Sequence, residues 1–462
     1  MTERQDALDD TPAADVRMRG FARRWTVDAV LAWVDAHTAA LDGEMISLDR
    51  AAGRVLTEDI VSQSDVPPFD RAMMDGYAVR AADTQGASPL QPMPLIVVGV
   101  ALPGDAPPGP VGAGSAVRIM TGAPMPAGAD SVLPAELAQS PQSSKAIPHD
   151  PLAVSAVGEV SPGKHVGSRG EDVAAGTTVL RGGRRLRPQD IGVLASIDCE
   201  AVRVVRRPRV RIVATGNEIY SQPSQRRPYA IADANGPMLA ALVERDGGTV
   251  ERLAITPDDV AALTAAIGCD ADVVIVSGGS SVGEEDHAPH VVAALGQLAI
   301  HGVAMRPSSP TGMGTLPRED GRPRLVFLLP GNPVSCLCAY DFFAGRAIRS
   351  LAGRDRCWPY RATTVRLARK ISSQVGRVDY ARVRYVDPPA SGSKQVPIGA
   401  EPSGVEPSDI GPSDVEPNSV EPISVSGASI LTSTTRADGF VVVPADSEGY
   451  PAAAVVTMFA YE

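Results

Sequence analysis

The chain has 462 residues and a net charge of −11, and 44% of its residues are apolar. This composition is typical of a soluble globular protein, and the length suggests about two to four domains. The acidic balance, with no long basic run, argues against a nucleic-acid partner. No apolar run reaches the ~18 residues of a membrane-spanning helix, and the polar N-terminus does not resemble a signal peptide. We therefore expect a cytoplasmic protein with no membrane partner.

The N-terminal part combines helical and β-type segments. Residues 1–23 are predicted to be a disordered tail. WTVDAVLAWVDAHTAAL (25–41) has apolar residues at helical spacing, with Thr26 as a candidate cap. Gly, Pro and short β-type runs then dominate, and the loop at 139–151 lies among them. These patterns predict a helical linker domain at 24–62 and 157–206 that carries an inserted β domain at 63–156.

Residues 207–356 alternate between strand-like and helix-like runs. This alternation predicts an open parallel α/β sheet domain. The expected helix at 256–268 has Thr256 as its cap and Pro257 in its first turn. The expected strands are 210–215, 249–255, 272–279 and 324–331, and the other expected helices are 235–247, 287–295 and 332–353.

Residues 357–462 return to β-type runs and predict a small C-terminal β-barrel or sandwich. Five approximate repeats, from EPSGV to EPISV, occupy 401–425. Because proline at this density cannot build a core, we expect a disordered Pro-rich insertion at 389–426. The five cysteines are scattered and odd in number, which favours a reduced chain. Cys336 and Cys338 lack zinc-site spacing and are expected to be small buried residues on a helix.

Three glycine-containing loops follow strands of the α/β domain: TGNE (215–218), SGGSSVGEED (277–286) and PGNP (330–333). Ligands of open α/β sheets bind beyond the carboxyl ends of the strands, and glycine lets backbone amides approach them. One such loop is usually ordinary turn geometry, but three at one sheet edge favour a ligand site. Neither a dinucleotide-binding G-x-G-x-x-G nor a P-loop is present.

Three further stretches lie outside this domain: PPFDRAMMDGYAVR (67–80), RIMTGAPMPAGAD (118–130) and GSRGEDVAAG (167–176). The turn at Asp75–Gly76 either presents a carboxylate or is only a structural hairpin. RIMTGAPMPAGAD changes abruptly from apolar to turn-rich around Thr121. By spacing alone, Glu171 and Asp172 are best explained as a solvated pair.

Together and in this order, eight stretches resemble the molybdopterin molybdenumtransferase family, which includes the E domain of gephyrin. They are PPFDRAMMDGYAV, RIMTGAPMPAGADSV, RGEDVAAG, VATGNEI, DANGPML, SGGSSVGEED, LPGNPVS and GRVDYARV. The resemblance implies an elongated multidomain subunit with a helical linker region, an inserted β domain, the α/β domain and a C-terminal β-barrel. It also implies a homodimer with the active cleft between subunits.

Such enzymes take molybdate and adenylylated molybdopterin as substrates, hydrolyse the adenylate with Mg²⁺ and release AMP. The resemblance places catalytic roles on Asp75, Thr121, Asp172, Glu218, Asp258 and Asp286. Glu218 and Asp286 are the predicted metal ligands, because Mg²⁺ binds carboxylates together with phosphates and waters. The substrate-binding positions are Ser277, Gly278, Gly279, Ser281, Gly283, Arg306, Ser309, Pro330, Gly331, Asn332, Pro333, Ser335 and Arg377. Expected protein partners are a molybdopterin adenylyltransferase and molybdoenzymes.

The sequence departs from the family pattern at the turn before residue 311. The family usually has Pro-Gly-Lys-Pro there, whereas residues 307–310 read Pro-Ser-Ser-Pro, so Ser309 replaces a lysine. Losing an ammonium weakens the attraction for a dianion such as molybdate, although Arg306 and Arg377 offer compensating charge. Two explanations stay open, a tolerated change and a weakened molybdate site.

Two other functions remain as alternatives. One is a non-catalytic molybdopterin-binding or scaffold member of the same family, which Ser309 favours and the retained carboxylates disfavour. The other is the adenylyltransferase activity usually found on a smaller, separate α/β domain, against which the flanking modules argue.

Overall fold

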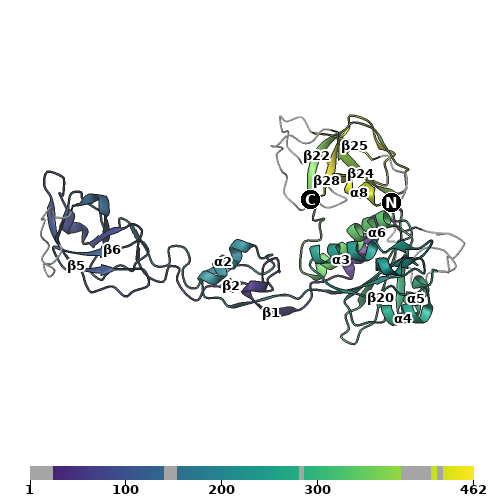
Figure 1. The fold of residues 1–462 in the computed structure, drawn as a ribbon, viewed down its shortest axis with the longest axis horizontal. Helices are drawn as coiled ribbons and strands as arrows, with labels where there is room; N and C mark the ends of the chain where they lie inside the picture. Colours follow the sequence, from purple (N-terminus) through teal and green to yellow (C-terminus); the bar gives the residue numbers. More distant parts are fainter. Residues whose placement is uncertain (1–23, 140–152, 280–285, 387–417, 424–429, 462) are drawn as a thin grey trace, which may run out of the picture. The chain divides into compact units, whose positions relative to one another are not determined.

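A computed structural model describes residues 24–139, 153–279, 286–386, 418–423 and 430–461 (Figure 1). The chain divides into two compact units, Met1–Glu44 with Val205–Glu462, and Met45–Val204. The predicted tail at 1–23 and nearly all of the loop predicted at 139–151 lie outside the described residues. Within the described ranges, no helix has the length and apolarity to cross a membrane.

The first unit is built on a six-stranded sheet with the order β16-β13-β17-β21-β20-β18. The strands β16, β13, β17 and β21 are parallel, as expected, whereas β20 pairs antiparallel with both β21 and β18 and so runs opposite to the other five strands. The sheet is mixed rather than purely parallel, because it contains β20, which lies with β18 in the segment 297–316, where the sequence predicts no strand. In chain order the bounds are β13 Arg209–Ala214, β16 Thr249–Arg252, β17 Val273–Ser277, β18 Gln297–His301, β20 Gly312–Leu316 and β21 Arg324–Leu329.

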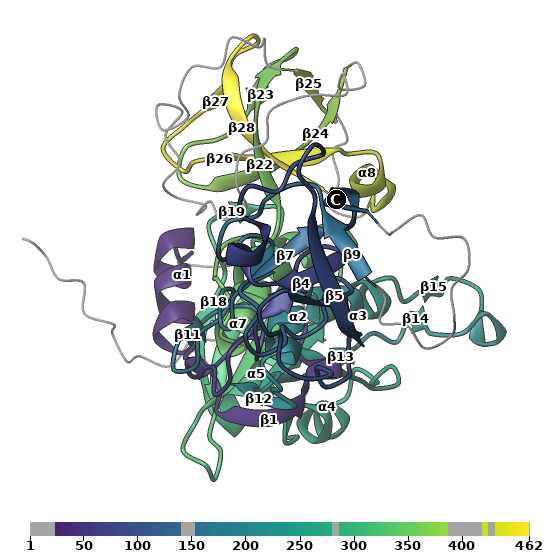
Figure 2. The same ribbon diagram turned by 90° about the vertical axis from the view of Figure 1, so that its left-hand side faces the viewer.

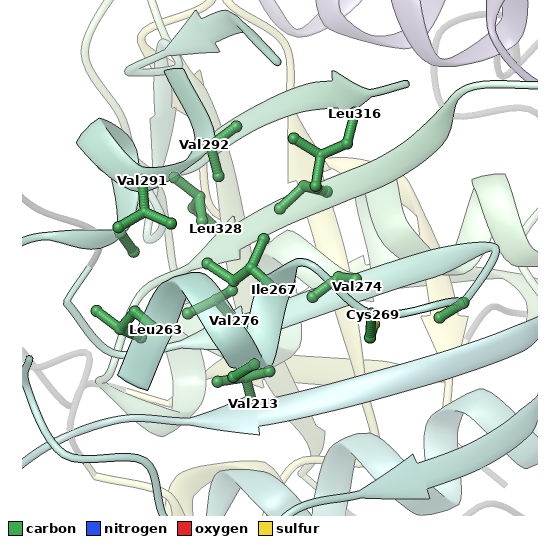
Figure 3. Close-up of a cluster of buried hydrophobic side chains, with 14 residues drawn as sticks. Val213, Leu263, Ile267, Cys269, Val274, Val276, Val291, Val292, Leu316 and Leu328 are labelled. Atoms are coloured by element: carbon green, nitrogen blue, oxygen red, sulfur yellow. The ribbon is translucent and has the colours of Figure 1, made fainter. Parts of the chain in front are cut away.

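Helices α3 (Asn235–Arg245), α4 (Val260–Ile267) and α5 (Ala288–Leu295) connect these strands. Figure 3 shows a core in which Val213 and Val276 of the sheet lie near Leu263 and Ile267 of α4. Helix α4 begins later than predicted because Asp259, not Thr256, accepts the capping hydrogen bonds from the amides of Ala261 and Ala262. The amide of Thr256 instead donates to Ala214 O over 2.8 Å and continues the edge of the sheet.

The last helical segment comprises α6 (Pro333–Ala339), the π-helix η5 (Tyr340–Ala344) and α7 (Gly345–Leu351). Cys336 and Cys338 are buried in α6, as predicted, and all five cysteines are free. Burial raises the pKa of the Cys336 thiol to about 12, so this group is unreactive at neutral pH.

Helix α1 (Val27–Ala36) begins at Thr26, whose Oγ1 accepts from the Ala29 amide over 3.2 Å, so the predicted cap is confirmed. The helix packs against α7 and η5. The Arg346 guanidinium donates to both carboxylate oxygens of Asp35, at 2.8 and 2.7 Å. By these contacts α1 belongs to the first unit, whereas we had placed residues 24–44 in the linker domain.

The C-terminal strands form a closed sheet, which confirms the predicted barrel (Figure 2). Five strands make the ring β24-β25-β22-β28-β26, which the pairing of β26 with β24 closes, and β19 adds to β24. The bounds are β19 Met305–Arg306, β22 Arg361–Leu367, β24 Val378–Tyr385, β25 Ser419–Pro422, β26 Gly439–Val443 and β28 Val455–Ala460. The short helix α8 Thr432–Thr435 lies between β25 and β26.

Strand β25 corrects the predicted insertion at 389–426. Residues 418–423 of that range are described, and Ser419–Pro422 pairs with both β22 and β24. Val420 is fully buried, because both neighbouring strands cover its side chain. The prediction is therefore wrong for this segment, and the rest of the range lies outside the described residues.

The second unit contains a six-stranded sheet with the order β7-β4-β6-β5-β9-β8. Its strands are β4 Gly76–Val79, β5 Met93–Ala101, β6 Ser115–Ile119, β7 Ser131–Pro134, β8 Ala138–Gln139 and β9 Ala153–Ala156. A separate core around Leu56, Leu186 and Leu194 lies beside helix α2 (Pro188–Ser196).

Short paired strands complete the fold. They are β1 Gly43–Ser47 with β12 Ala201–Val205, β2 Ile60–Val61 with β11 Thr178–Leu180, β3 Arg71–Ala72 with β10 Val166–Gly167, β14 Ile219–Tyr220 with β15 Ile231–Ala232, and β23 Ile371–Ser372 with β27 Gly449–Tyr450.

Candidate functional site

The carboxyl ends of β13, β17 and β21 are adjacent in the sheet, so the three predicted loops meet at one edge. Together they line a cavity of about 530 Å³, here called the loop cavity. The predicted site residues in its wall are Glu218, Asp258, Ser277, Gly278, Gly279, Asp286, Pro330, Gly331, Asn332 and Pro333. Ser281 and Gly283 lie outside the described residues.

Glycine is required where the second loop crosses the first. Gly278 and Gly279 have φ angles of +100° and +58°, in the left-handed region that side chains disfavour. A Cβ atom on Gly278 would lie 2.3 Å from the carbonyl oxygen of Thr215, and one on Gly331 would lie 3.6 Å from Gly278 Cα. The missing side chain at Gly278 therefore allows the first two loops to approach closely, whereas a Cβ on Gly331 would make only an ordinary van der Waals contact.

Asp258 holds the first loop in place. Its Oδ1 accepts from Thr215 Oγ1 over 2.5 Å, and its Oδ2 accepts from the Asn217 amide over 3.1 Å. Asp258 lies just before α4, so these bonds join the loop after β13 to the start of that helix. Both oxygens already have protein donors, which suits a positioning role better than metal binding.

Glu218 and Asp286 are the two other carboxylates in the cavity wall. Glu218 is exposed and Asp286 is half-buried. Among the described residues, no group of three or more His, Cys, Asp or Glu side chains could hold a metal ion by itself. Two carboxylates in one cavity still match the one or two that Mg²⁺ usually takes from protein when phosphates and waters supply the rest.

Asn235 is a site residue that our sequence analysis did not assign. Its Nδ2 donates to Ser277 Oγ over 2.8 Å and to Gly331 O over 2.7 Å. A carbonyl oxygen can only accept, so these bonds fix the orientation of the amide group. Its Oδ1 is buried without a hydrogen-bond partner in the described part of the chain. The only sequence signal was its place in the quoted DANGPML stretch.

A second and larger cavity of about 930 Å³, here called the basic cleft, lies between the α/β domain and the barrel. The basic side chains in its lining are Arg24, Arg306, Lys370, Arg377 and Arg382. Among the described residues of its lining, Asp379 is the one carboxylate, and it accepts from Arg377 Nε over 3.0 Å. In the ranges that the structure describes, Arg24, Arg306, Lys370 and Arg382 have no carboxylate within ion-pair distance. Their excess charge favours an anionic ligand.

The structure brings six predicted substrate positions together in the basic cleft: Arg306, Ser309, Pro330, Asn332, Ser335 and Arg377. Lys370 and Arg382 are additional lining residues that the sequence analysis missed. Pro310, Pro330 and Asn332 line both cavities, so the cleft adjoins the cavity of the strand-end loops.

The remaining predicted positions lie in the second unit. Asp75 Oδ1 accepts from the amide and from Oγ1 of Thr121, each over 2.7 Å. The hydroxyl and amide of Thr121 hold the pKa of Asp75 below its usual range. Asp172 is exposed, and its amide donates to Val66 O over 3.0 Å. Its neighbour Glu171 is also exposed and pairs with Arg71 at 3.2 Å.

Comparison with protein families identifies the class first. Residues 25–197 match the MoeA N-terminal region (domain I and II), 211–350 match a probable molybdopterin binding domain, and 414–459 match the MoeA C-terminal region (domain IV). Two crystal structures of a molybdopterin biosynthesis MoeA protein from Pyrococcus horikoshii are 28% identical. They superpose with TM-scores of 0.73 and 0.70 over 95% of this chain and all of theirs. The chain thus has the MoeA-type multidomain fold.

Curated relatives then specify the family. Molybdopterin molybdenumtransferase 2 of Mycobacterium tuberculosis is 37% identical over 73% of this chain and 82% of its own length. Molybdopterin molybdenumtransferase of Nostoc sp. is 36% identical over 69% of this chain and 71% of its own. The chain belongs to the molybdopterin molybdenumtransferase family, whose enzymes act in molybdenum cofactor biosynthesis.

Proposed function

We propose that this enzyme inserts molybdenum into adenylylated molybdopterin, hydrolyses the adenylate in a Mg²⁺-dependent step and releases AMP. The observation that carries this proposal is the shared wall of Pro310, Pro330 and Asn332 between two chemically different cavities. One cavity offers carboxylates and glycine turns, and the adjoining cleft offers excess positive charge. Adenylylated molybdopterin has a phosphoanhydride at one end, which needs the carboxylates and glycine turns. Its other end receives molybdate, which needs the positive charge, so the two cavities must adjoin.

The residues of the loop cavity fit the phosphoanhydride. The turns at Gly278, Gly279 and Gly331 have no side chains to block the approach of phosphate oxygens to backbone amides. Glu218 and Asp286 would hold Mg²⁺, which would neutralise charge that develops on the phosphates. Asp258 and Asn235 keep the three loops together through the hydrogen bonds described above.

The basic cleft fits molybdate, the second substrate. Arg306 and Arg377 would supply positive charge to the dianion, and the hydroxyls of Ser309 and Ser335 are hydrogen-bond donors in the same wall. Ser309 Oγ is buried and has no partner in the described residues, so it retains an unused donor. The charge in the cleft supports molybdate binding even though position 309 lacks an ammonium group.

We also propose that the enzyme acts as a homodimer, as the family resemblance implies, and that Asp75, Thr121 and Asp172 take part in the same reaction. The hydrogen bonds from Thr121 support this role for Asp75, because they keep its carboxylate ionised and oriented. Light scattering on the purified full chain tests the assembly, and a monomeric mass would contradict it.

Supply of adenylylated molybdopterin, Mg²⁺ and molybdate to the purified chain, followed by AMP quantification, tests the reaction. We expect AMP release that requires both Mg²⁺ and molybdate. The matched variants are Glu218→Gln, which should be impaired, and Glu251→Gln, whose carboxylate pairs with Arg211 at 2.6 Å and lies outside the cavity wall. Retained ligand binding without AMP release would instead support a non-catalytic scaffold, which the serine at position 309 favours.

A further inference from the structure

The turn at 307–310 is strained but heavily bonded. Ser308 has a φ of +89°, a conformation that costs a non-glycine residue about 1 kcal/mol or more. Its carbonyl oxygen accepts from the amide of Thr311 over 3.1 Å and from Thr311 Oγ1 over 2.7 Å. The Val303 amide donates to Ser309 O over 2.8 Å. The backbone of the turn is therefore fixed on both sides of Ser309.

The side chain of Ser308 links this turn to another wall of the basic cleft. The residue is only 3% exposed, and its Oγ donates to Ser335 O over 2.6 Å. Ser335 belongs to α6, whose preceding loop contributes Pro330 and Asn332 to both cavities. On the opposite side, Asn235 holds the same loop through Gly331 O. The segment 330–335 therefore accepts one of these hydrogen bonds from Ser308, which lines the basic cleft, and the other from Asn235, which lines the loop cavity.

We propose that Ser308 is a positioning residue for the oxoanion end of the site. Its hydroxyl fixes the distance between the 307–310 turn, which carries Ser309, and the α6 segment, which carries Ser335. Both of these residues line the basic cleft, so the bond holds two donors of the oxoanion site in register. This bond also explains why a side chain is present at a backbone position that glycine would adopt without strain. The inference rests on the proposed binding of molybdate in this cleft.

The test is direct binding of molybdate and, separately, of AMP to the full chain by calorimetry. Ser308→Ala keeps the Cβ atom and loses the hydroxyl, whereas Ser308→Gly loses the hydroxyl and relieves the backbone. We expect both variants to bind molybdate about fivefold more weakly, the effect of one hydrogen bond of ordinary net strength. AMP affinity should stay within about twofold, because Asn235 holds the loop cavity independently.

Thr311→Val is the matched control, since it removes a buried hydroxyl from the same turn without touching α6. Its molybdate affinity should match that of the wild type. Wild-type affinity in either Ser308 variant would overturn the positioning role. An equal loss in Thr311→Val would also overturn it, because general stability of the turn would then be the cause. A wild-type chain that binds AMP but no molybdate would instead refute the proposed function itself, and with it this role for Ser308.

Discussion

The side-chain amide of Asn235 donates to the carbonyl oxygen of Gly331 over 2.7 Å and so ties the start of α3 to the loop before α6. Because the same Nδ2 also donates to Ser277 Oγ, one amide group holds the ends of β17 and β21 together. Both bonds are largely shielded from water, since Asn235 is only 7% exposed. The side chain of Asn235 therefore adds two hydrogen bonds to the backbone pairing of β17 with β21, which already places the two substrate-binding loops side by side.

Replacement of Asn235 by alanine should lower kcat/KM for AMP release about tenfold, because one buried and one partly buried hydrogen bond are lost. Asn235→Asp should lower it further, since a carboxylate oxygen would then face the Gly331 carbonyl. Initial rates over a range of substrate concentrations measure both effects. Asn418→Ala in the barrel is the control and should behave as wild type. Equal rates for the alanine variants at positions 235 and 418 would contradict the role given to Asn235.

Loss of either proposed metal ligand should change the requirement for Mg²⁺. In Glu218→Gln and Asp286→Asn, we expect half-maximal AMP release to require an Mg²⁺ concentration about tenfold higher. This shift corresponds to roughly 1.4 kcal/mol of lost binding free energy for Mg²⁺. Titration of the rate with Mg²⁺ measures this shift. Glu251→Gln should keep the wild-type curve. A lowered maximal rate with an unchanged Mg²⁺ midpoint would remove metal binding from the roles of both carboxylates.

A lysine at position 309 should strengthen molybdate binding. Ser309→Lys adds a positive charge to the wall of the basic cleft, and we expect about fivefold tighter binding at low salt. The gain should shrink as ionic strength rises, because salt screens exposed charges. Calorimetry at two salt concentrations measures it. Ser196→Lys, on the exposed end of α2, controls for net charge. Unchanged affinity in the position-309 variant would show that the absent ammonium is without consequence.

Thr121→Val should raise the pKa of Asp75. The Thr121 hydroxyl is the largest cause of the lowered value, and the Thr121 amide is the second. The variant keeps the amide, so the pKa should rise toward the ordinary value without reaching it. Carboxyl NMR resonances followed between acidic and neutral pH measure this titration. Thr57→Val is the control, because the Thr57 hydroxyl donates to Arg203 O at a different place in the same unit. An unaltered Asp75 titration in Thr121→Val would contradict the bond.

Asp272 should stabilise the α/β domain in a pH-dependent way. Burial by itself would raise the pKa of Asp272, but hydrogen bonds from Arg206, the Arg209 amide and Arg318 outweigh burial and lower it to about 2. Its contribution is therefore complete above the unfolded pKa near 3.8 and is lost as the pH falls through about 2. At neutral pH, Asp272→Asn should cost about 3 kcal/mol of unfolding free energy, because the partly buried Arg206 and Arg318 lose their buried partner.

Thermal unfolding between pH 7 and pH 2 measures this contribution, and the difference between wild type and Asp272→Asn should narrow at the acidic end. Asp270→Asn is the matched control. The Asp270 carboxylate is 71% exposed and also pairs with Arg209 and Arg318, so its loss should cost no more than about 1 kcal/mol. A difference that persists unchanged at pH 2 would contradict the assignment.

The sequence predicted correctly the elements that their own residues mark. Examples are β13, β17 and β21, which are apolar runs, and the glycine-containing loops that follow them. Strand β20 was missed because Gly312 and Gly314 interrupt its strand signal, although the close approach of Gly314 to Gln297 O in β18 requires glycine. The cap of α4 was misplaced because Thr256 and Asp259 are both suitable residues. Only the hydrogen bond of Thr256 to the sheet decides between them.

The unpredicted site residues depend on contacts between distant segments. Asn235 bonds to residues 42 and 96 positions away, so no local pattern marks it. Lys370 and Arg382 join the site only because the barrel packs near the strand ends of the α/β domain. Val420 resembles the other valines of its repeats, and only its place between β22 and β24 buries it.

Strands β24 and β25 are antiparallel neighbours in the barrel, although a long stretch of sequence separates them. The amide of Val386 donates to Ser419 O over 3.0 Å, so the chain leaves and re-enters the barrel at neighbouring positions. The entropy of closing a connection between such points grows slowly with its length, by about 0.6 kcal/mol per doubling. The part of the repeats that precedes Ser419 can therefore lengthen or shorten during evolution with little effect on the barrel. The same position is a natural point at which to insert a reporter domain or to substitute a short turn.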